Sequence, residues 1–433
     1  MEKKRNYVEI VLGFVLLFGA LALGNAKLES PMLVFRLAMG MSLGYVFARA
    51  YTGFAGSVNR AYNTGSTKLM RAMAMMFFLT AVGVAGFLVF NVQTPNAEGE
   101  LVQAFAAGIK PINMGLLLGG LMFGFGMALS SCCASGIMSD LAAEAPKAII
   151  TMFFFGLGVV LGMPMDTKPW VQNSWISVGG KNGVFFPDLF KGSPVIMYLG
   201  GILVTGIIAL VVIIASFKYE AYRKEKGTLG FVPSEKRVEE EAKQTLPTEK
   251  KALVSYIYDK LFVNAWSAFT GDTIISSLLL PMFVATNGGW GASGPFGNWT
   301  AKVLMLVGVK AETLGAYTGK GAEFFTGSIF ANGIGVQNMG IAIGAYVYLL
   351  TSAQMSKTAK NFFHVPKFQW FLFALGGIVM GFGTRMSQGC NAGALYTPVA
   401  QMSLSGWVFL LALIVGGILG NTFQKFVFEK ASE

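Results

Sequence analysis

The sequence predicts an all-α, polytopic membrane protein in which two inverted, pseudo-symmetric helical repeats carry short broken helices with glycine-rich cysteine motifs. Composition is the first observation behind this prediction. Of 433 residues, 54% are hydrophobic and only 13% are charged, which is more apolar surface than a soluble core can bury. The other two observations are the apolar runs that recur along the chain and a glycine-rich stretch of its first half that returns in its second half.

Apolar runs that approach the ~20 residues of a spanning helix occur at residues 8–23, 72–90, 148–163, 194–217 and 406–421. Several are rich in glycine, which membrane helices tolerate. The first run follows basic residues as a signal peptide would, but no small-residue cleavage pattern comes after it. We therefore expect a retained first helix and further spans later in the chain.

Charge predicts the orientation of these spans. Residues 3–5 are basic and precede the first run, so the positive-inside rule places the N-terminus in the cytoplasm. Residues 91–108 carry acidic side chains without Lys or Arg, and residues 166–193 are rich in glycine and aromatic side chains, so both are expected outside. We expect the C-terminus in the cytoplasm and interpret several basic residues as markers of topology: Arg49, Arg60, Lys68, Arg71 and Lys147.

A charged segment divides the chain into residues 1–217, a linker at 218–260 and residues 261–433. We expect a solvated cytoplasmic connector, although its mixed charges would also suit a helix that docks a cytoplasmic partner. The formal net charge is +11, but the cations lie between apolar runs rather than along one basic stripe. Nucleic acid is therefore not an expected partner.

The two membrane halves contain related motifs. Residues 119–136 read GGLMFGFGMALSSCCASG and residues 376–393 read GGIVMGFGTRMSQGCNAG, which are identical at 8 of 18 positions without a gap. Roughly two matches would arise by chance at this glycine content, so an internal repeat explains the pair better. In this alignment Ser130 matches Ser387 and Cys133 matches Cys390.

The repeats are expected to be inverted. Counting spans from the N-terminus makes the first motif run from outside to inside. The second motif follows a basic loop with Lys357, Lys360 and Lys367, so it should run from inside to outside. Inverted halves with glycine-interrupted helices at equivalent places indicate a transport site at the repeat interface, near the middle of the membrane.

The motif glycines permit two interpretations. Without side chains they allow close helix packing, or they expose backbone to a substrate route, and packing alone explains each glycine taken singly. Their repetition beside a cysteine favours the functional interpretation. The glycines concerned are Gly124, Gly126, Gly136, Gly381, Gly383, Gly389 and Gly393.

The thiols are the strongest candidates for contact with a substrate. A thiol is polarizable and a weak hydrogen-bonding group, so Cys133 and Cys390 could offer successive weak contacts to a soft, moving anion. Cys132 has no cysteine partner in the repeat, and burial as a small hydrophobic residue explains it equally well. A structural disulfide is not expected from three cysteines of which two are adjacent, and the sequence has no CxxC motif of a thiol oxidoreductase.

Several polar residues near the motifs complete the predicted pathway. Arg385 is an ionised residue within a span, which favours a role with an anion, although snorkelling to the interface explains it nearly as well. Hydrogen bonds to the substrate, or alternatively between helices, are expected from Ser130, Ser387, Gln388 and Asn391. Asp272 and Glu323 would suit proton coupling, but we expect them at the interface.

A single histidine among 433 residues argues against haem, a multi-histidine metal site and histidine catalysis. The sequence also has no ATP-binding loop. We therefore expect no cofactor, no metal and no catalytic residues in this chain.

The motifs resemble those of the YeeE/YedE family of sulfur-transport membrane proteins, above all residues 381–409, GFGTRMSQGCNAGALYTPVAQMSLSGWVF. The resemblance implies a helical inner-membrane protein with pseudo-symmetric halves that takes up thiosulfate past essential cysteines, here Cys133 and Cys390. Two features depart from the family: residues 52–60, TGFAGSVNR, lack an early cysteine, and Cys132 stands where glycine is usual. A selenium compound, as in the YedE-like branch, or another sulfur oxyanion therefore remains an alternative substrate.

The expected function is a permease for thiosulfate or a related sulfur- or selenium-containing anion, without an enzymatic step. Its expected partners are that anion, the lipid bilayer and a cytoplasmic sulfur-carrier protein. A membrane sulfurtransferase that takes a persulfide onto the same cysteines is the alternative, and a structural subunit that docks a partner through residues 218–260 is a third.

Overall fold

The computed structural model describes residues 6–90, 93–95, 101–103, 108–247, 250–286, 289–360 and 367–432. These residues are helical almost throughout, apart from one antiparallel pair of three-residue strands, β1 (Gln93–Pro95) and β2 (Leu101–Gln103). Within them, 10 helical stretches are long and apolar enough to cross a membrane. The predicted all-α membrane class is confirmed, and each predicted apolar run falls on one of these stretches.

Eight helices and a one-turn helix precede the linker: α1 (Tyr7–Lys27), α2 (Pro31–Ala50), α3 (Phe54–Thr64), α4 (Lys68–Val89), α5 (Met114–Ser130), α6 (Ala134–Ala143), α7 (Ala145–Gly162), α8 (Pro169–Gln172) and α9 (Pro194–Glu225). Side-chain caps define two of their starts. Ser30 accepts a hydrogen bond from the backbone N–H of Leu33 before α2, and Asn113 accepts one from Leu116 before α5.

The remainder of the chain forms α10 (Pro233–Ala242), α11 (Lys250–Tyr258), α12 (Ala268–Thr286), α13 (Gly294–Leu306), α14 (Ala311–Thr318), α15 (Ala322–Thr326), α16 (Gly333–Thr351), α17 (Met355–Ala359), α18 (Lys367–Met386), α19 (Thr397–Ala400) and α20 (Leu404–Ser432). A π-helical turn, Asn391–Tyr396, follows the second cysteine motif. This turn leads directly into α19.

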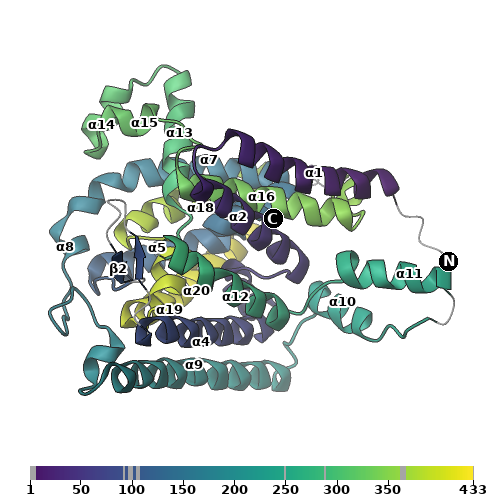
Figure 1. The fold of residues 1–433 in the computed structure, drawn as a ribbon, viewed down its shortest axis with the longest axis horizontal. Helices are drawn as coiled ribbons and strands as arrows, with labels where there is room; N and C mark the ends of the chain where they lie inside the picture. The colour runs from purple at the N-terminus through teal and green to yellow at the C-terminus, as the bar shows by residue number, and fades with distance from the viewer. Residues whose placement is uncertain are drawn as a thin grey trace.

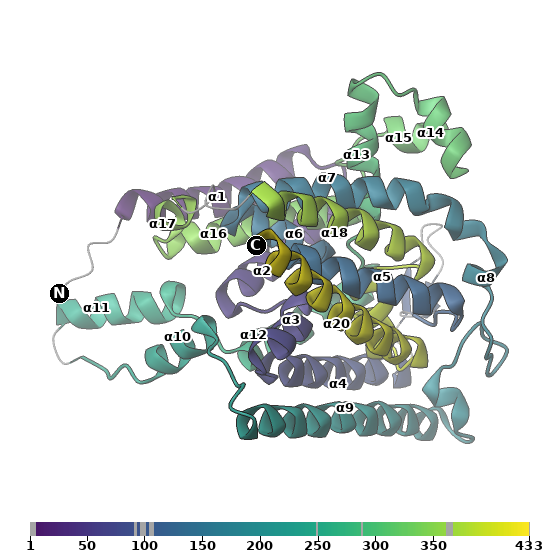
Figure 2. The same ribbon diagram turned by 180° about the vertical axis from the view of Figure 1, so that it is seen from behind.

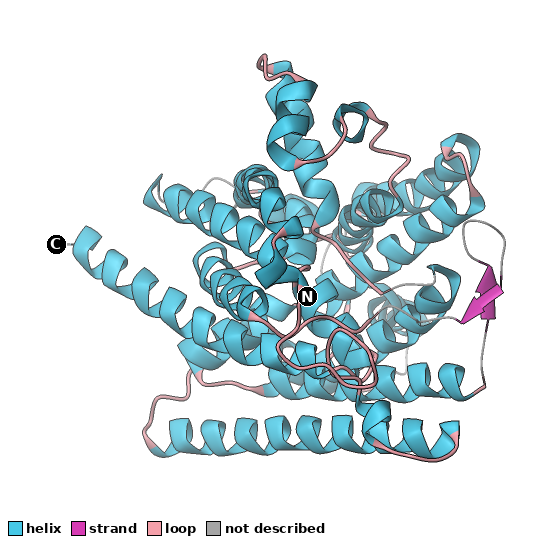
Figure 3. Ribbon diagram, turned by 90° about the vertical axis from the view of Figure 1, so that its left-hand side faces the viewer, coloured by secondary structure: helices cyan, strands magenta, loops and turns pink. Residues whose placement is uncertain are grey.

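The long helices lie along the longest axis of the molecule, and the connecting segments gather at its two ends (Figure 1). Helices α10 and α11 lie beyond one end, which we call the linker end. Strand β2 and helix α8 lie at the opposite end, which we call the loop end, and Figure 3 looks onto it. Segments that the charge pattern assigns to opposite sides of the membrane thus lie at opposite ends of the bundle.

Helices α5, α7, α18 and α20 pack together, and Figure 2 shows them side by side. The contact between α5 and α18 is reciprocal and antiparallel. A Cβ on Gly119 would stand 2.6 Å from the carbonyl oxygen of Gly383, and a Cβ on Gly383 would stand 2.8 Å from that of Gly119. Gly126 and Gly376 make the matching contact further along. The glycines of the two contacts are equivalent in the repeat alignment, and the inverted relation between the halves stays a prediction.

The linker is not a freely solvated connector over its whole length. Helix α9 continues to Glu225, past the predicted boundary at residue 217. Helix α10 is bound to the membrane helices: Ser66 Oγ donates to Glu235 Oε1 over 2.7 Å, and Arg237 Nη1 donates to Tyr51 Oη over 2.6 Å. Part of the linker therefore covers the linker end of the bundle.

Candidate functional site

The two cysteine motifs fold into the same local backbone. Ser131 and Gln388, which are equivalent in the repeat, take left-handed conformations with φ of 56° and 54°. Cys133 and Cys390 then adopt extended conformations and begin the next helical segments. A left-handed conformation costs a residue with a side chain roughly 1–2 kcal/mol, so other contacts must hold both turns.

Ser130 and Ser387 supply equivalent contacts. Ser130 Oγ donates to Gly126 O over 2.9 Å and lies 3.4 Å from Cys132 O. Ser387 Oγ donates to Gly383 O over 2.8 Å and lies 2.9 Å from Gly389 O. Both serines bond to the backbone of their own motif, so they hold the turns that carry the cysteines. Direct substrate contact by either hydroxyl stays a prediction.

The cysteines are buried and reduced. Their exposures are 2% for Cys132, 2% for Cys133 and 1% for Cys390, and all three are free thiols. Cys133 Sγ lies 3.5 Å from Ser135 Oγ. Cys133 and Cys390 lie close enough to interact electrostatically, so the fold brings the two repeat-matched thiols into one region of the core.

Two of the thiols border a cavity of about 250 Å³. Cys132 and Cys133 form one wall of it, and the connection between α2 and α3 contributes Thr52 and Gly53 to another. Cys390 is not among the residues that line it. The cavity beside Cys133 therefore does not extend to Cys390 in this conformation.

Arg60 on α3 supplies positive charge to this cavity. Its Nη2 donates to Tyr51 O over 2.6 Å, and in the described chain no carboxylate lies within 4.0 Å of its guanidinium. Asp140 also lines the cavity, but Lys147 Nζ lies 3.0 Å from its Oδ2 and pairs with Glu144 as well. The free charge that faces an incoming ligand is therefore that of Arg60.

The cavity adjoins a wider hollow of about 470 Å³ at Tyr51 and Arg60, which line both. Residues 231–234 and Arg237 of the linker form its outer wall. Arg237 Nη1 also lies 3.0 Å from Gln354 Oε1, so the linker is anchored to two membrane helices at this mouth.

Cys390 has a different environment near the loop end. Lys110 Nζ donates to Gln388 O over 2.6 Å and interacts electrostatically with Cys390. Burial, together with the nearby Arg385 guanidinium, lowers the pKa of Lys110 to about 8. Gln388 Nε2 donates to Val171 O over 2.9 Å, which holds the turn against the segment after α7.

The Arg385 guanidinium has two polar neighbours, a carboxylate and a hydroxyl. Its Nη1 lies 3.8 Å from Asp166 Oδ2, and its Nη2 lies 3.3 Å from Ser293 Oγ. Asn391 Nδ2 lies 3.4 Å from Met127 Sδ, and its buried Oδ1 has no hydrogen-bond partner among the described residues. Whether Arg385 contacts the substrate or snorkels to the interface stays open, and Asn391 retains an unused acceptor beside Cys390.

Most motif glycines serve close packing. Gly124 meets Leu413 of α20 and Gly381 meets Phe155 of α7, both at backbone oxygens, and a Cβ on Gly389 would lie 2.8 Å from Ala394 N. Two glycines have more room. A Cβ on Gly136 would lie 3.5 Å from Cys133 Sγ, and one on Gly393 would lie 3.8 Å from Trp290 O. The packing interpretation thus explains the helix-interior glycines, as it does Gly126 and Gly383.

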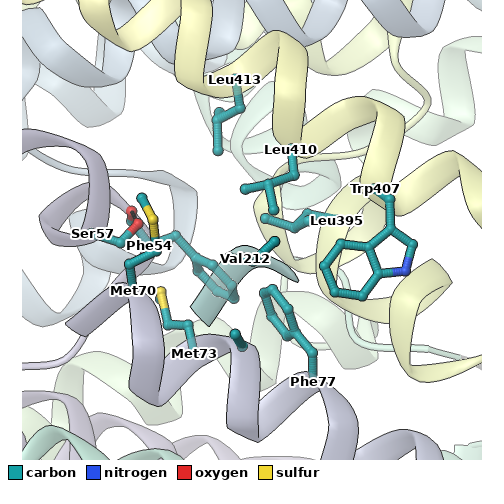
Figure 4. Close-up of a pocket in the computed structure, with 11 residues that line it drawn as sticks. Phe54, Ser57, Met70, Met73, Phe77, Val212, Leu395, Trp407, Leu410 and Leu413 are labelled. Atoms are coloured by element: carbon teal, nitrogen blue, oxygen red, sulfur yellow. Dashed lines mark hydrogen bonds between the residues drawn. The ribbon is translucent and has the colours of Figure 1, made fainter. Parts of the chain in front are cut away.

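Figure 4 shows a second cavity, of about 20 Å³, between α3, α4, α9 and α20. Its walls are apolar and aromatic side chains such as Met73, Phe77, Leu395 and Trp407, and no cysteine or cation lines it. It has room for about one water molecule and offers no charge to an anion. The cysteine cavity is therefore the better candidate for a binding site.

Sequence reasoning missed three residues near the thiols. The charge pattern predicts only a topology marker at Arg60, Lys110 lies just beyond the external segment that is expected to lack cations, and Thr52 belongs to neither cysteine motif. Asp272 is 1% exposed within the bundle, and its placement at the membrane interface stays a prediction. Glu323 on α15 is exposed. The signal that could have found Arg60 is its position in a short helix between two glycine-containing turns.

Across the described part of the chain, no group of three or more His, Cys, Asp or Glu side chains could hold a metal ion, and the single histidine, His364, lies outside that part. The described residues contain ten helical stretches apolar enough to cross a membrane and a cavity lined by two thiols and Arg60, which together indicate a multi-pass membrane protein with an internal polar site. The chain belongs to the Sulphur transport family, whose model matches residues 49–419. The predicted YeeE/YedE membership is thereby confirmed.

Relatives of this chain include proteins named YedE and TsuA. The chain is 30% identical over 161 residues to the probable transporter YedE of Escherichia coli K12, which is 37% of this chain and 38% of that protein. It is 22% identical over 391 residues to the thiosulfate transporter TsuA of the same organism, covering 89% and 92% of the two chains. TsuA of Spirochaeta thermophila is 25% identical over 313 residues, 71% of this chain and 77% of the relative. The YedE match thus spans well under half of the relative.

Proposed function

We propose that this chain carries thiosulfate, or a related sulfur- or selenium-containing anion, across the cytoplasmic membrane along a route past Cys390 and Cys133. Both termini and the linker would then face the cytoplasm. The observation that carries the proposal is one cavity of about 250 Å³ that is lined by two thiols and by Arg60, which has no ion pair among the described residues. The names of the TsuA relatives support the substrate class.

The chemistry of the cavity suits a soft anion. An anion that leaves water needs compensating positive charge, which the Arg60 guanidinium provides with several N–H donors. The thiols of Cys132 and Cys133 are polarizable and weakly hydrogen bonding. A transport site must bind without trapping, and weak contacts beside one strong charge meet that requirement.

Positive charge also lies near the second thiol. Lys110 interacts electrostatically with Cys390 at the loop end, and Arg60 lines the same cavity as Cys133 toward the linker end. An anion would therefore meet a cation before each thiol. Passage between the thiols requires the turns at Ser131 and Gln388 to move, because the cavity ends before Cys390.

Uptake by proteoliposomes tests the proposal. Purified protein is reconstituted, and uptake of radiolabelled thiosulfate, sulfite, sulfate and selenite is measured for the wild type, Cys133→Ala and Cys390→Ala. We expect uptake of thiosulfate or selenite by the wild type and loss of at least about 90% of it in each variant, since each removes a polarizable contact from a single route. Size-exclusion profiles like that of the wild type serve as the folding control, and uptake at the wild-type rate by both variants would contradict the proposal.

The position of Cys132 and Cys133 toward the linker end also favours a second function, a persulfide carrier. In that reaction the outer sulfur of a carrier protein's persulfide would pass to the thiolate of Cys133, and the carrier would keep a thiol. Mass spectrometry of the intact protein after exposure to a persulfide donor separates the two functions. An added sulfur on Cys133 supports the carrier, and transport without any adduct supports the permease.

A further inference from the structure

A buried carboxylate adjoins the cysteine cavity. Asp272 on α12 is 1% exposed, and its Oδ1 accepts a hydrogen bond from Thr52 Oγ1 over 2.6 Å. Its Oδ2 has no hydrogen-bond partner in the part of the chain that the structure describes. Among the residues that the structure describes, no Lys or Arg lies within 4.0 Å of it. A charge so poorly compensated is costly within a membrane protein, so this carboxylate has a strong reason to bind a proton.

The cavity and the carboxylate are linked through two residues. Thr52 lines the cavity and donates to Asp272, and Arg60 lines the cavity and interacts electrostatically with the same carboxylate. Whatever occupies the cavity beside Arg60 therefore changes the potential at Asp272.

The other ionisable groups around Asp272 are few. Tyr396 interacts with it electrostatically, but the Tyr396 hydroxyl is bonded to Thr80 Oγ1 over 2.6 Å. On α2, which packs against α12, Arg49 is bound to backbone oxygens such as that of Asn264. On α4, Arg71 pairs with Glu220 over 2.8 Å. Arg60 is thus the cation whose charge acts on Asp272.

We propose that Asp272 is the proton-binding site of this transporter and that a proton moves in the same direction as the anion. The inference rests on the proposed transport function. An anion beside Arg60 cancels the charge that favours an ionised carboxylate and adds a negative neighbour, so anion binding favours protonation of Asp272. Linkage makes the effect reciprocal: a protonated Asp272 favours anion binding at Arg60. Two ligands that assist each other's binding are carried together.

The geometry favours a proton over a metal cation. One free carboxylate oxygen is a poor site for a metal ion, which requires several oxygen ligands. The described residues contain no cluster of acidic side chains near Asp272 that would add them. A proton needs only the single acceptor that Oδ2 provides.

Transport of radiolabelled thiosulfate by proteoliposomes tests the inference. The vesicles are either loaded with the labelled anion, to follow exchange, or diluted into it, to follow accumulation. With the outside one pH unit more acidic, we expect the wild type to accumulate thiosulfate up to about tenfold for each proton carried. Asp272→Asn should lose accumulation driven by the pH gradient and keep exchange of internal for external thiosulfate. Glu323→Gln, which alters an exposed carboxyl group on α15, is the matched control and should keep both activities.

Thr52 provides an independent variant. Thr52→Val removes the hydrogen bond that favours the ionised carboxylate, so the proton should bind more tightly and the pH of half-maximal stimulation should rise. Thr52→Ser keeps the hydroxyl and should restore the wild-type value. If Asp272→Asn does not fold, Thr52→Val and Thr52→Ser still test the inference. An unchanged pH of half-maximal stimulation in Thr52→Val counts against it.

The outcomes separate this inference from the function on which it rests. Thiosulfate uptake by the wild type that ignores the pH gradient, or that follows a sodium gradient instead, overturns proton coupling and leaves transport intact. Accumulation that persists in Asp272→Asn overturns the assignment of the site. Absence of wild-type uptake for thiosulfate, sulfite, sulfate and selenite overturns the transport function itself.

Discussion

The turns at Cys133 and Cys390 share a backbone but not an environment. Each follows a glycine-rich helix, contains a left-handed residue and is held by an equivalent serine. Cys133 borders a cavity with Arg60, which has no ion pair in the described part of the chain. Cys390 is enclosed where Lys110 is bound to Gln388 and Arg385 lies near Asp166. The repeated sequence thus sets the local geometry, and the surrounding helices decide which thiol a ligand can reach.

The largest expected effect concerns how readily a reagent reaches the thiols of Cys133 and Cys390. In variants that retain only Cys133 or only Cys390, a small polar thiol reagent added from the linker end should modify Cys133 at least about tenfold faster, because only Cys133 lines the cavity. The measurement is the rate of modification by mass spectrometry. Equal rates would remove the distinction between the two turns.

Arg237 sharpens that experiment. It binds Tyr51 and Gln354 at the mouth of the cavity, so Arg237→Ala should loosen residues 231–237 and increase the rate at Cys133. Lys236→Ala is the matched control, since the Lys236 side chain is 58% exposed. An unchanged rate in Arg237→Ala would show that the linker does not limit access.

The charge at the cavity makes the second prediction. Arg60→Gln removes a charge-assisted contact of about 1.5–3 kcal/mol, which should lower the initial rate of thiosulfate uptake at low concentration about 10–100-fold. Arg60→Lys keeps the charge and should recover part of the loss. Wild-type uptake by Arg60→Gln would show that the anion does not pass through this cavity.

Lys110 predicts a pH dependence at the other turn. Its pKa is lowered to about 8, so the ammonium group is charged below that pH and neutral above it. With equal pH on both sides, uptake from the loop end should fall about tenfold between pH 7 and pH 9 as the charge is lost. Lys110→Arg stays charged and should flatten the profile. The same pH dependence of uptake in the wild type and in Lys110→Arg would exclude Lys110 from the route.

Packing between the motifs makes the smallest prediction. Gly119→Ala and Gly383→Ala each place a methyl group against the opposing backbone, and each should destabilise the fold by about 1–3 kcal/mol. Because the contact is reciprocal, the two losses should be similar. Gly136→Ala has ordinary contact distances and should leave stability nearly unchanged. Thermal unfolding in detergent measures all three, and clearly unequal losses for the first two would argue against an equivalent contact.

Much of the fold was predictable because its signals are local. Apolar runs mark the spans, and the ungapped repeat with its cysteines marked both motifs and the family. The site was predictable only in part. Cys132 and Cys133 do border a cavity, but the serines proved to bond to their own turns, and Arg385 has partners within the bundle. Which atoms a hydroxyl or guanidinium meets depends on neighbours that are distant in the chain.

The sequence by itself determined the class of protein, five of the ten spans in the described residues, the repeated cysteine motif and the family, since composition, apolar runs and short motifs carry these. Only the tertiary structure decided that Arg60 and Thr52 share a cavity with Cys133, that Lys110 approaches Cys390, and that the Asp272 side chain is buried. The physical reason is that electrostatics acts through space. A cation that marks topology and a cation that binds an anion look the same along the chain, and they differ only in what folding places beside them.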